Sequence, residues 1–321
     1  MIGHPAVRHW YDTHPVRPGR ATVDDPAVLK LLDKVAPGVA VSDLGGGNGL
    51  NLLLGDDLVL RVHKPFISRT RLVGERELRQ KLADQGLRVG VPAGDGLVRC
   101  GPRWAELERF VPTEYLEPDL AWLFAAIGRL HRVLATVPGG PVRPKIVTLA
   151  SPQTLRRWLT TNRAAGHPGA VPELDPILRE LAQRWIPTDR LPHQLVHGDP
   201  HPDNVLLSLD HKPLYLDFGS IMSAPRVFDL SYALAHVLIR LGQPRDEIPT
   251  AVRAYEESAG WRLTAPERAA LIPYAASVPL YYDICDWGDG GPFRDVSTWL
   301  LRLPAQLLVK ARPSETRSIR R

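Results

Sequence analysis

The chain has 321 residues, of which 44% are hydrophobic and 23% charged, and its formal net charge is +5. It is long enough for two compact bodies, and no window carries the long uncharged apolar run that crosses a membrane. Much of the excess charge lies between Lys310 and Arg321, without aromatic or zinc-binding spacing, so it does not predict nucleic-acid binding.

The start of the chain and the cysteines indicate the compartment. Met1–Pro5 lacks the basic-then-apolar pattern of a secretory signal. Cys100 and Cys285, the two cysteines of the sequence, form at most one disulfide. We therefore expect a reduced, cytoplasmic protein.

Short apolar segments separated by polar turns predict a β-rich first domain, residues 1–111. A helix over 27–34 follows the start signal Asp25-Pro26. Strands are expected at 38–42, 50–54 and 58–62, the last two joined by a turn at 55–57. A helix over 71–85 and a second strand pair ending at 107–111 complete the domain, and Pro112 marks its boundary.

Helical spacing of apolar residues predicts a mainly helical second domain, residues 112–321. Leu120, Leu123, Ile127 and Leu134 repeat with that spacing. Further helices are expected around 151–162, 174–185 and 230–241. The predicted fold class is α+β, a small antiparallel sheet domain followed by a larger helical one.

A glycine cluster lies between the first two strands. Taken alone, it resembles the first loop of an S-adenosylmethionine-dependent methyltransferase, which leads from a strand into a helix. Here a strand follows instead, so we interpret the cluster as a nucleotide-covering loop whose small residues let backbone N–H groups approach phosphates. A plain turn without ligand is the alternative. The loop residues are Gly45, Gly46, Gly47, Asn48 and Gly49.

Arg61 lies in an otherwise apolar strand, so its charge requires a partner. Glu75 lies early in the next helix, on the face marked by Leu78 and Leu82. A strand cation paired with a helix carboxylate would position the α- and β-phosphates of a nucleotide. A surface arginine on an edge strand is the alternative.

The most informative motif is His197-Gly198-Asp199-Pro200-His201-Pro202-Asp203-Asn204, followed by Leu216-Asp217-Phe218-Gly219. Two short apolar strands between them predict a hairpin that carries Asn204 and Asp217 to one end. An Asp that accepts a hydroxyl proton, beside an Asn and an Asp that hold magnesium on phosphates, is the apparatus of phosphoryl transfer. The motif predicts a kinase.

A metal-dependent hydrolase is the alternative of a different class. His197, Asp199, His201 and Asp203 alternate along the chain, as the ligands of a hydrolytic metal do. Pro200 and Pro202 interrupt any regular strand there, and the sequence holds no second His-rich cluster. We therefore prefer phosphoryl transfer.

With these motifs, the chain resembles the aminoglycoside phosphotransferase family, which includes choline and homoserine kinases and has a two-lobed protein-kinase-like fold. The resemblance implies Asp199 as the catalytic base, His197 as a brace of its loop, and Asn204 and Asp217 as ligands of Mg²⁺. It also implies ATP or GTP as cosubstrate, with backbone groups from Glu108 through Phe110 to Val111 facing the purine. Asp229 resembles a buried Asp that supports the catalytic loop, and a helix N-cap is its other reading.

The chain departs from the family pattern in two ways, at Arg61 and in its net charge of +5, which is basic whereas members that act on polycationic antibiotics are often acidic. The usual phosphate-binding Lys is Arg61 here, whose planar fork binds phosphate with different geometry. Compared with protein kinases, Gly198 replaces an Arg, and only twelve positions separate Asp217 from Asp229. That spacing leaves no room for a long activation segment, so we expect a small-molecule acceptor.

The segment from Tyr281 to Asp289 combines aromatic residues with carboxylates and suits a cationic, polyhydroxylated acceptor. An aminoglycoside or related antibiotic is the acceptor we favour. The protein would then be a phosphotransferase with an alcohol group as acceptor, and it would serve in antibiotic resistance or self-protection. A metabolite kinase for homoserine, a choline-like amino alcohol or a sugar is the alternative, and a solvated helix end is the reading without a ligand. The substrate residues proposed are Tyr282, Asp283, Asp286 and Trp287.

Overall fold

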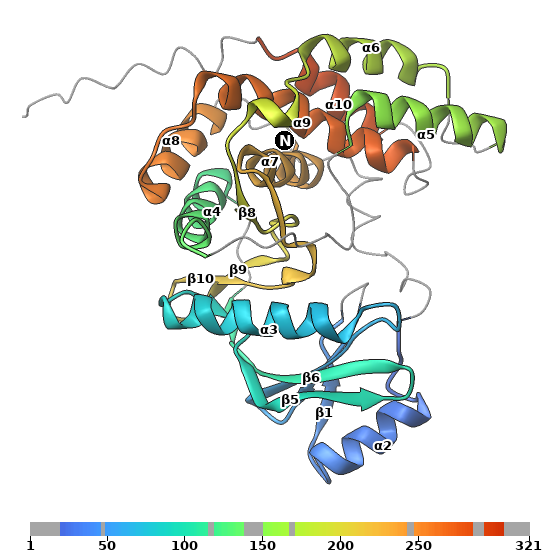
Figure 1. Ribbon diagram of the computed structural model, residues 1–321, viewed down its shortest axis with the longest axis vertical. Helices are drawn as coiled ribbons and strands as arrows, with labels where there is room; N and C mark the ends of the chain where they lie inside the picture. Colours follow the sequence, from blue (N-terminus) through green and yellow to red (C-terminus); the bar gives the residue numbers. More distant parts are fainter. Residues whose placement is uncertain are drawn as a thin grey trace, which may run out of the picture. The chain divides into compact units, whose positions relative to one another are not determined.

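The computed structural model describes residues 20–45, 49–114, 119–137, 150–166, 171–242, 247–284 and 292–304 (Figure 1). Contacts divide the chain into two compact units. The N-terminal unit consists of the described residues of His9–Glu117 and Asp203–Gly219. The C-terminal unit consists of those of Pro118–Pro202 and Ser220–Arg321.

A five-stranded antiparallel sheet with the order β1-β2-β3-β6-β5 forms the framework of the N-terminal unit. Two helices accompany it in the chain, α2 before the first strand and α3 after the third. Their bounds are α2 (Pro26–Val35), β1 (Val41–Asp43), β2 (Leu50–Leu54), β3 (Leu58–Val62), α3 (Arg69–Asp84), β5 (Pro92–Cys100) and β6 (Arg103–Arg109).

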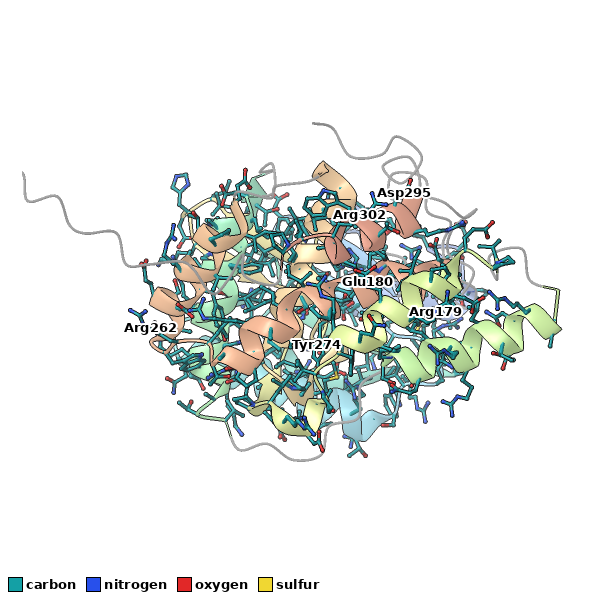
Figure 2. The ribbon with its side chains drawn as sticks, turned by 90° about the horizontal axis from the view of Figure 1, so that it is seen from above. Arg179, Glu180, Arg262, Tyr274, Asp295 and Arg302 are labelled. Atoms are coloured by element: carbon teal, nitrogen blue, oxygen red, sulfur yellow. The ribbon has the colours of Figure 1, made fainter. Side chains whose placement is uncertain are left out.

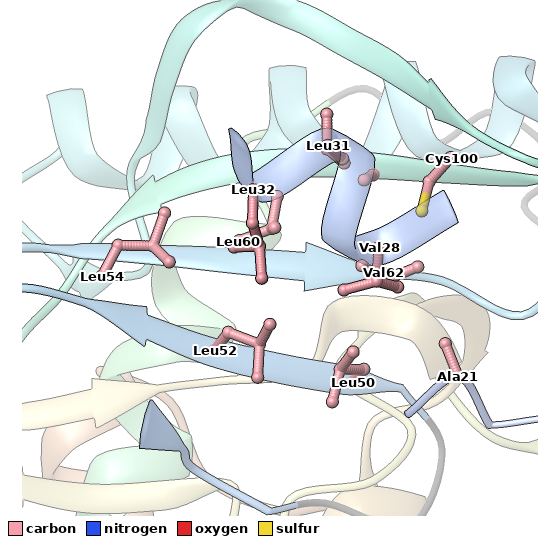
Figure 3. Packing of buried hydrophobic residues seen from close by; sticks show 11 residues of the cluster. Ala21, Val28, Leu31, Leu32, Leu50, Leu52, Leu54, Leu60, Val62 and Cys100 are labelled. Atoms are coloured by element: carbon pink, nitrogen blue, oxygen red, sulfur yellow. The ribbon is translucent and has the colours of Figure 1, made fainter. Parts of the chain in front are cut away.

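Strand alternation builds the core of this unit. In β2, Leu50, Leu52 and Leu54 are buried while the residues between them are less so, as period-two side-chain geometry requires. Helix α2 contributes apolar side chains to the same cluster (Figure 3). Asp25 accepts a hydrogen bond from the Ala27 N–H and caps this helix.

A second sheet of the N-terminal unit, with the order β4-β10-β9-β7, contains the predicted hairpin. Its strands are β4 (Arg88–Val89), β7 (Thr113–Glu114), β9 (Val205–Ser208) and β10 (Pro213–Tyr215). The sequence-based boundary at residue 112 assigns this hairpin to the second domain. Its backbone hydrogen bonds are instead with β4 and β7, and contacts group it with the first.

The C-terminal unit is mainly helical. Gly128 of α4 packs so closely on α8 that a Cβ atom there would lie 2.6 Å from the Tyr255 carbonyl oxygen, so glycine is required. The elements are α4 (Leu120–Leu134), α5 (Pro152–Ala164), α6 (Leu174–Arg184), η1 (Thr188–Arg190), β8 (His193–Val196), β11 (Met222–Pro225), α7 (Val227–Leu241), α8 (Ile248–Ala259), α9 (Ala265–Ile284) and α10 (Pro292–Leu301).

The predicted elements are confirmed where the structure describes them, usually within two residues of the expected ends. The larger differences are at the first strand, expected at 38–42 and found at Val41–Asp43, and at α7, expected from residue 230 and found from Val227. Within the described ranges, no helix has the length and apolar character needed to span a membrane. The basic segment from Lys310 to Arg321 lies outside the described residues.

Candidate active site

The loop after β8 begins with a glycine that the backbone requires. β8 pairs with β11, and this pairing brings residue 198 against the segment that precedes β11. Gly198 has φ +82°, and a Cβ atom there would lie 2.2 Å from the carbonyl oxygen of Ser220. Any side chain at this position would displace the loop that carries Asp199.

Asp229 holds the same loop through hydrogen bonds with its backbone. It is fully buried, and its carboxylate accepts hydrogen bonds from the His197 N–H at 2.7 Å and the Gly198 N–H at 2.9 Å. The Nε2 atom of His131 lies 2.9 Å from the same carboxylate. Helix α7 begins at Val227 with Arg226 as its N-cap residue, so the N-cap reading of Asp229 is wrong and the loop-supporting one is confirmed.

Asp199 follows Gly198 in this loop and contacts residues of the C-terminal unit. The Asp199 N–H donates to Nδ1 of the buried His197 at 3.3 Å, and the role of His197 as a brace of the loop stays a prediction. The Nε2 atom of His201 lies 3.8 Å from Asp199 Oδ1. The His201 ring stacks on that of His236, with 5.1 Å between ring centroids.

The hydrolase reading requires a cluster of metal ligands at this loop. Throughout the described part of the chain, no group of three or more His, Cys, Asp or Glu side chains is arranged to hold a metal ion. His197 instead packs in the interior and contacts its own loop. The geometry of the loop therefore offers the hydrolase no support.

The hairpin positions Asn204 and Asp217 as its pattern predicts. Val205 pairs with Tyr215, and the Leu216 N–H donates to the Asn204 carbonyl oxygen at 2.9 Å. Asp217 follows in the left-handed region, with φ +51°, which Asp and Asn tolerate better than most residues. Its carboxylate accepts a hydrogen bond from the Gly219 N–H at 3.2 Å, which fixes the turn after the strand.

Arg61 of β3 contacts two acids, neither of them the expected one. Its guanidinium lies 3.7 Å from Glu108 Oε2 and 3.8 Å from Asp217 Oδ1. Burial lowers the pKa of Arg61, but the charges of Glu108 and Asp217 outweigh it, so the group stays protonated.

The expected ion pair between Arg61 and Glu75 is absent from the described residues. Glu75 is buried on the predicted face of α3, but it accepts a hydrogen bond from Arg71 at 2.7 Å, one helical turn away. Arg71 in turn donates to the carbonyl oxygen of Gly219 at 2.7 Å. Glu75 therefore reaches the segment after Asp217 through Arg71, and it acts on Arg61 through its charge without an ion pair.

A buried acid that sequence reasoning missed is Glu106. It lies directly across from Arg61 in the pairing of β3 and β6, and two residues before Glu108, so both acids share one face of the strand. Arg79 of α3 contacts both carboxylates, and His63 lies 3.0 Å from Glu106. Burial raises the pKa of Glu106, but the hydrogen bond with His63 and the charge of Arg79 lower it overall.

The glycine loop joins two antiparallel strands, which confirms the hairpin and excludes the strand-to-helix loop of a methyltransferase. Gly45 has φ +81°, and its N–H donates to Asp43 at 2.8 Å. The Asn51 side chain donates to the Gly45 carbonyl oxygen at 2.9 Å. Gly46, Gly47 and Asn48 lie outside the described residues.

The backbone groups proposed to face a purine are partly engaged within the sheet. The Arg109 N–H donates to the Val91 carbonyl oxygen at 2.8 Å, and the Phe110 N–H donates to the Asp57 carbonyl oxygen at 2.8 Å. Purine contacts through these two donors are therefore not available in this conformation. The Glu108 side chain is directed to Arg61 and Arg79.

Two of the four proposed substrate residues lie in the described part of α9. The Tyr282 hydroxyl is buried within hydrogen-bond distance of Tyr232 and His236, at 3.1 Å from each. Asp283 is 1% exposed, and both its carboxylate oxygens are without a hydrogen-bond partner in the described residues. Asp286 and Trp287 lie outside the described residues.

The environment of Asp283 changes its titration. Burial raises the pKa of Asp283 to about 7, against the opposing charge of Arg294 and with a contribution from Asp295. Because the folded state holds the proton more tightly than the unfolded state, this group favours folding at low pH. That contribution is lost as the pH rises from about 4 through about 7.

Comparison with known protein families decides the family of the chain. A family model described as "Phosphotransferase enzyme family" matches residues 41–271, which is more than half of the chain. The chain belongs to the phosphotransferase enzyme family. The match includes the glycine loop, Arg61, the Asp199 loop, the hairpin and Asp229, so these residues all lie within the family region of this phosphotransferase.

Solved structures show the same fold. An amicoumacin kinase in complex with AMP-PNP, Ca²⁺ and Ami is 15% identical, with a TM-score of 0.61, and the match covers 90% of this chain and 94% of that chain. A choline/ethanolamine kinase family protein from Mesorhizobium loti is 16% identical, with a TM-score of 0.56 and coverage of 89% and 95%. The ADP-bound aminoglycoside phosphotransferase APH(2'')-Ib is 13% identical, with a TM-score of 0.55 and coverage of 89% and 99%.

At these identities the likeness establishes the fold of this phosphotransferase, the kinase-like α+β fold with an antiparallel sheet and many helices that the sequence predicts. A search of curated proteins found no match to the chain.

Proposed function

We propose that this phosphotransferase transfers the γ-phosphoryl group of ATP or GTP to a hydroxyl group of a small cationic alcohol, such as an aminoglycoside or a related antibiotic. The observation that carries the proposal is the Asp199 loop, held at two backbone N–H groups by the buried Asp229. Such a rigid carboxylate has the chemistry of a general base for a hydroxyl acceptor. Phosphorylation would inactivate an antibiotic that needs that hydroxyl.

The proposed reaction is a direct transfer. The acceptor oxygen forms a bond with the γ-phosphorus while the bond from that phosphorus to the β,γ-bridging oxygen breaks. The electron pair leaves with the nucleoside diphosphate, and the hydroxyl proton passes to Asp199. Arg61 supplies positive charge for the phosphates, because the acids around it keep it protonated and oriented.

Magnesium is the metal that the residues on the hairpin fit. Asn204 and Asp217 offer an amide oxygen and a carboxylate, and Mg²⁺ prefers few such hard oxygen ligands together with substrate phosphates. The Arg61 contact at 3.8 Å and the Gly219 N–H fix the orientation of the Asp217 carboxylate. When bound, Mg²⁺ would neutralise charge on the phosphates.

A positive charge on the acceptor is supported by Asp283. A buried carboxylate without a hydrogen-bond partner in the described residues is costly to ionise, and a ligand ammonium group would offset that cost. The similar structures include kinases named for aminoglycosides and for choline or ethanolamine. Aminoglycosides and choline share a hydroxyl group and a positively charged nitrogen, so a metabolite of the choline type is the second candidate acceptor.

An acceptor screen tests the proposal. Release of ADP or GDP is measured with aminoglycosides, other amino antibiotics, choline, ethanolamine, homoserine and neutral sugars, and products are checked by mass for one added phosphoryl group. We expect turnover with a cationic alcohol and little with neutral sugars. Turnover confined to neutral sugars would contradict the cationic acceptor, and hydrolysis without any phosphorylated alcohol would contradict phosphoryl transfer to an acceptor.

The variant Asp283→Asn sharpens the test. It is expected to raise KM for the cationic acceptor roughly tenfold, the effect of losing one hydrogen bond to a charged group, and to leave nucleotide KM unchanged. Because the variant has no buried carboxylate to ionise, it should also be more stable than wild type at neutral pH. This gain in stability should disappear near pH 4, and measuring it shows that the variant folds. The matched control is Glu180→Gln, an exposed carboxylate on α6 (Figure 2), with acceptor KM near wild type.

A further inference from the structure

Helix α7 places three polar side chains on one face, below the Asp199 loop. Asp229, Tyr232 and His236 are spaced by three and four residues, so they follow one another along the helix. All three are buried. Asp229 binds the loop backbone, whereas Tyr232 forms a side-chain hydrogen bond with Asp199.

Hydrogen bonds extend from Tyr232 to α9 and back to α7. The hydroxyl groups of Tyr232 and Tyr282 lie 3.1 Å apart, and Nε2 of His236 lies 3.1 Å from the Tyr282 hydroxyl. The rings of Tyr232 and His236 are in contact, with centroids 4.4 Å apart. The cluster is thus packed as well as hydrogen-bonded.

The chemistry of these groups fixes which group donates in each of these hydrogen bonds. An ionised carboxylate only accepts hydrogen bonds, so Tyr232 must donate to Asp199. The Tyr232 oxygen then accepts from the Tyr282 hydroxyl, and the Tyr282 oxygen accepts from an N–H at His236 Nε2. Each donor polarises the next, which strengthens the bond that reaches the carboxylate.

We infer that Tyr232 is a positioning residue for the base, holding the Asp199 carboxylate oriented and ionised, with Tyr282 and His236 fixing its hydroxyl. The inference rests on the proposed role of Asp199. In this unit, the titratable groups near Asp199 include His197 and His201 on its own loop. Burial and then the negative charge of Asp199 raise the pKa of Tyr232 well above its usual value, so its hydroxyl keeps the proton it donates.

Tyr232→Phe is the direct test. Loss of a hydrogen bond to the charged form raises the pKa of a carboxyl group, so the acid limb of the kcat/KM profile should move up by about one pH unit. kcat should fall roughly tenfold, with nucleotide KM unchanged. The control is Tyr274→Phe on α9 (Figure 2), whose hydroxyl donates to the Ile186 carbonyl oxygen at 2.7 Å. That variant should keep the wild-type profile.

Two more variants guard against a merely structural effect. A difluorotyrosine at position 232 is a stronger donor of nearly the same shape, and it should move the acid limb to lower pH. Tyr282→Phe should move it upward by less than Tyr232→Phe does. An unchanged limb in both Tyr232 variants would overturn the inference, and so would a Tyr282→Phe effect confined to acceptor KM, which would make Tyr282 an acceptor contact.

These outcomes are distinct from failure of the proposed function. If Asp199→Asn keeps wild-type turnover, the base assignment fails whatever Tyr232 does. If Asp199→Asn is inactive while Tyr232→Phe matches wild type, only the positioning role is lost.

Discussion

Asp199→Asn is expected to reduce turnover by two to four orders of magnitude, roughly the contribution of a general base, and to leave nucleotide affinity within about twofold of wild type. Asparagine has the size of aspartate, and its carbonyl oxygen still accepts the Tyr232 hydrogen bond. It does not take up a proton from the acceptor at neutral pH. Steady-state turnover and calorimetric nucleotide titration together separate the lost chemistry from lost binding.

Asp203→Asn is the matched control for this variant. Asp203 is an exposed acid four residues further along, and phosphoryl transfer assigns it no role. Its turnover should stay near wild type. A hydrolytic metal held by the alternating His and Asp residues predicts instead that both variants lose activity together. Near-normal turnover in Asp199→Asn would reject Asp199 as the base.

Asp229→Ala is expected to have the largest effect on stability. The buried carboxylate accepts from two backbone N–H groups and contacts His131, and its removal leaves these groups without their acceptor in a dry interior. We expect a loss of roughly 3–5 kcal/mol in the free energy of unfolding, as when one partner of a buried ionic network is removed. Urea unfolding measures it, and turnover should fall as the loop loosens.

The control for Asp229→Ala is Asp175→Ala. Asp175 is a partly exposed acid of α6, paired with Arg163 at 2.8 Å, and surface pairs of this kind contribute at most about 1 kcal/mol. If both variants lose the same small amount, Asp229 does not hold the loop.

Much of the fold is predictable because its signals are local. Leu50, Leu52 and Leu54 alternate along one strand, so the sequence of that strand alone predicts which of its side chains are buried. The hairpin from Val205 to Tyr215 follows from two apolar runs and a polar turn, which also places Asn204 beside Leu216. Asp229 as the loop support follows from the family resemblance, and the structure confirms it.

The parts that escaped prediction depend on contacts between elements distant in the chain. The partner of Arg61 is decided by the register of β3 and β6, which brings Glu106 opposite it and Glu108 nearby. Glu75 had a closer cation, Arg71, on its own helix. The hydrogen bonds from Tyr232 to Tyr282 and His236 depend on the way α9 packs on α7. Their sequence signal is a Tyr three residues after Asp229.

In the proposed division of work, Asp217 would hold magnesium with the nucleotide and Asp199 would act on the acceptor. The most direct test is calorimetric binding of a non-hydrolysable ATP analogue, with and without Mg²⁺, to wild type, Asp199→Asn and Asp217→Asn. Asparagine tolerates the left-handed backbone at position 217, so the change there is confined to charge and metal affinity.

We predict that Mg²⁺ tightens binding to wild type and Asp199→Asn by roughly tenfold, and that this gain disappears in Asp217→Asn. A full Mg²⁺ effect retained in Asp217→Asn, or lost in Asp199→Asn alone, would contradict the assignment of the two carboxylates.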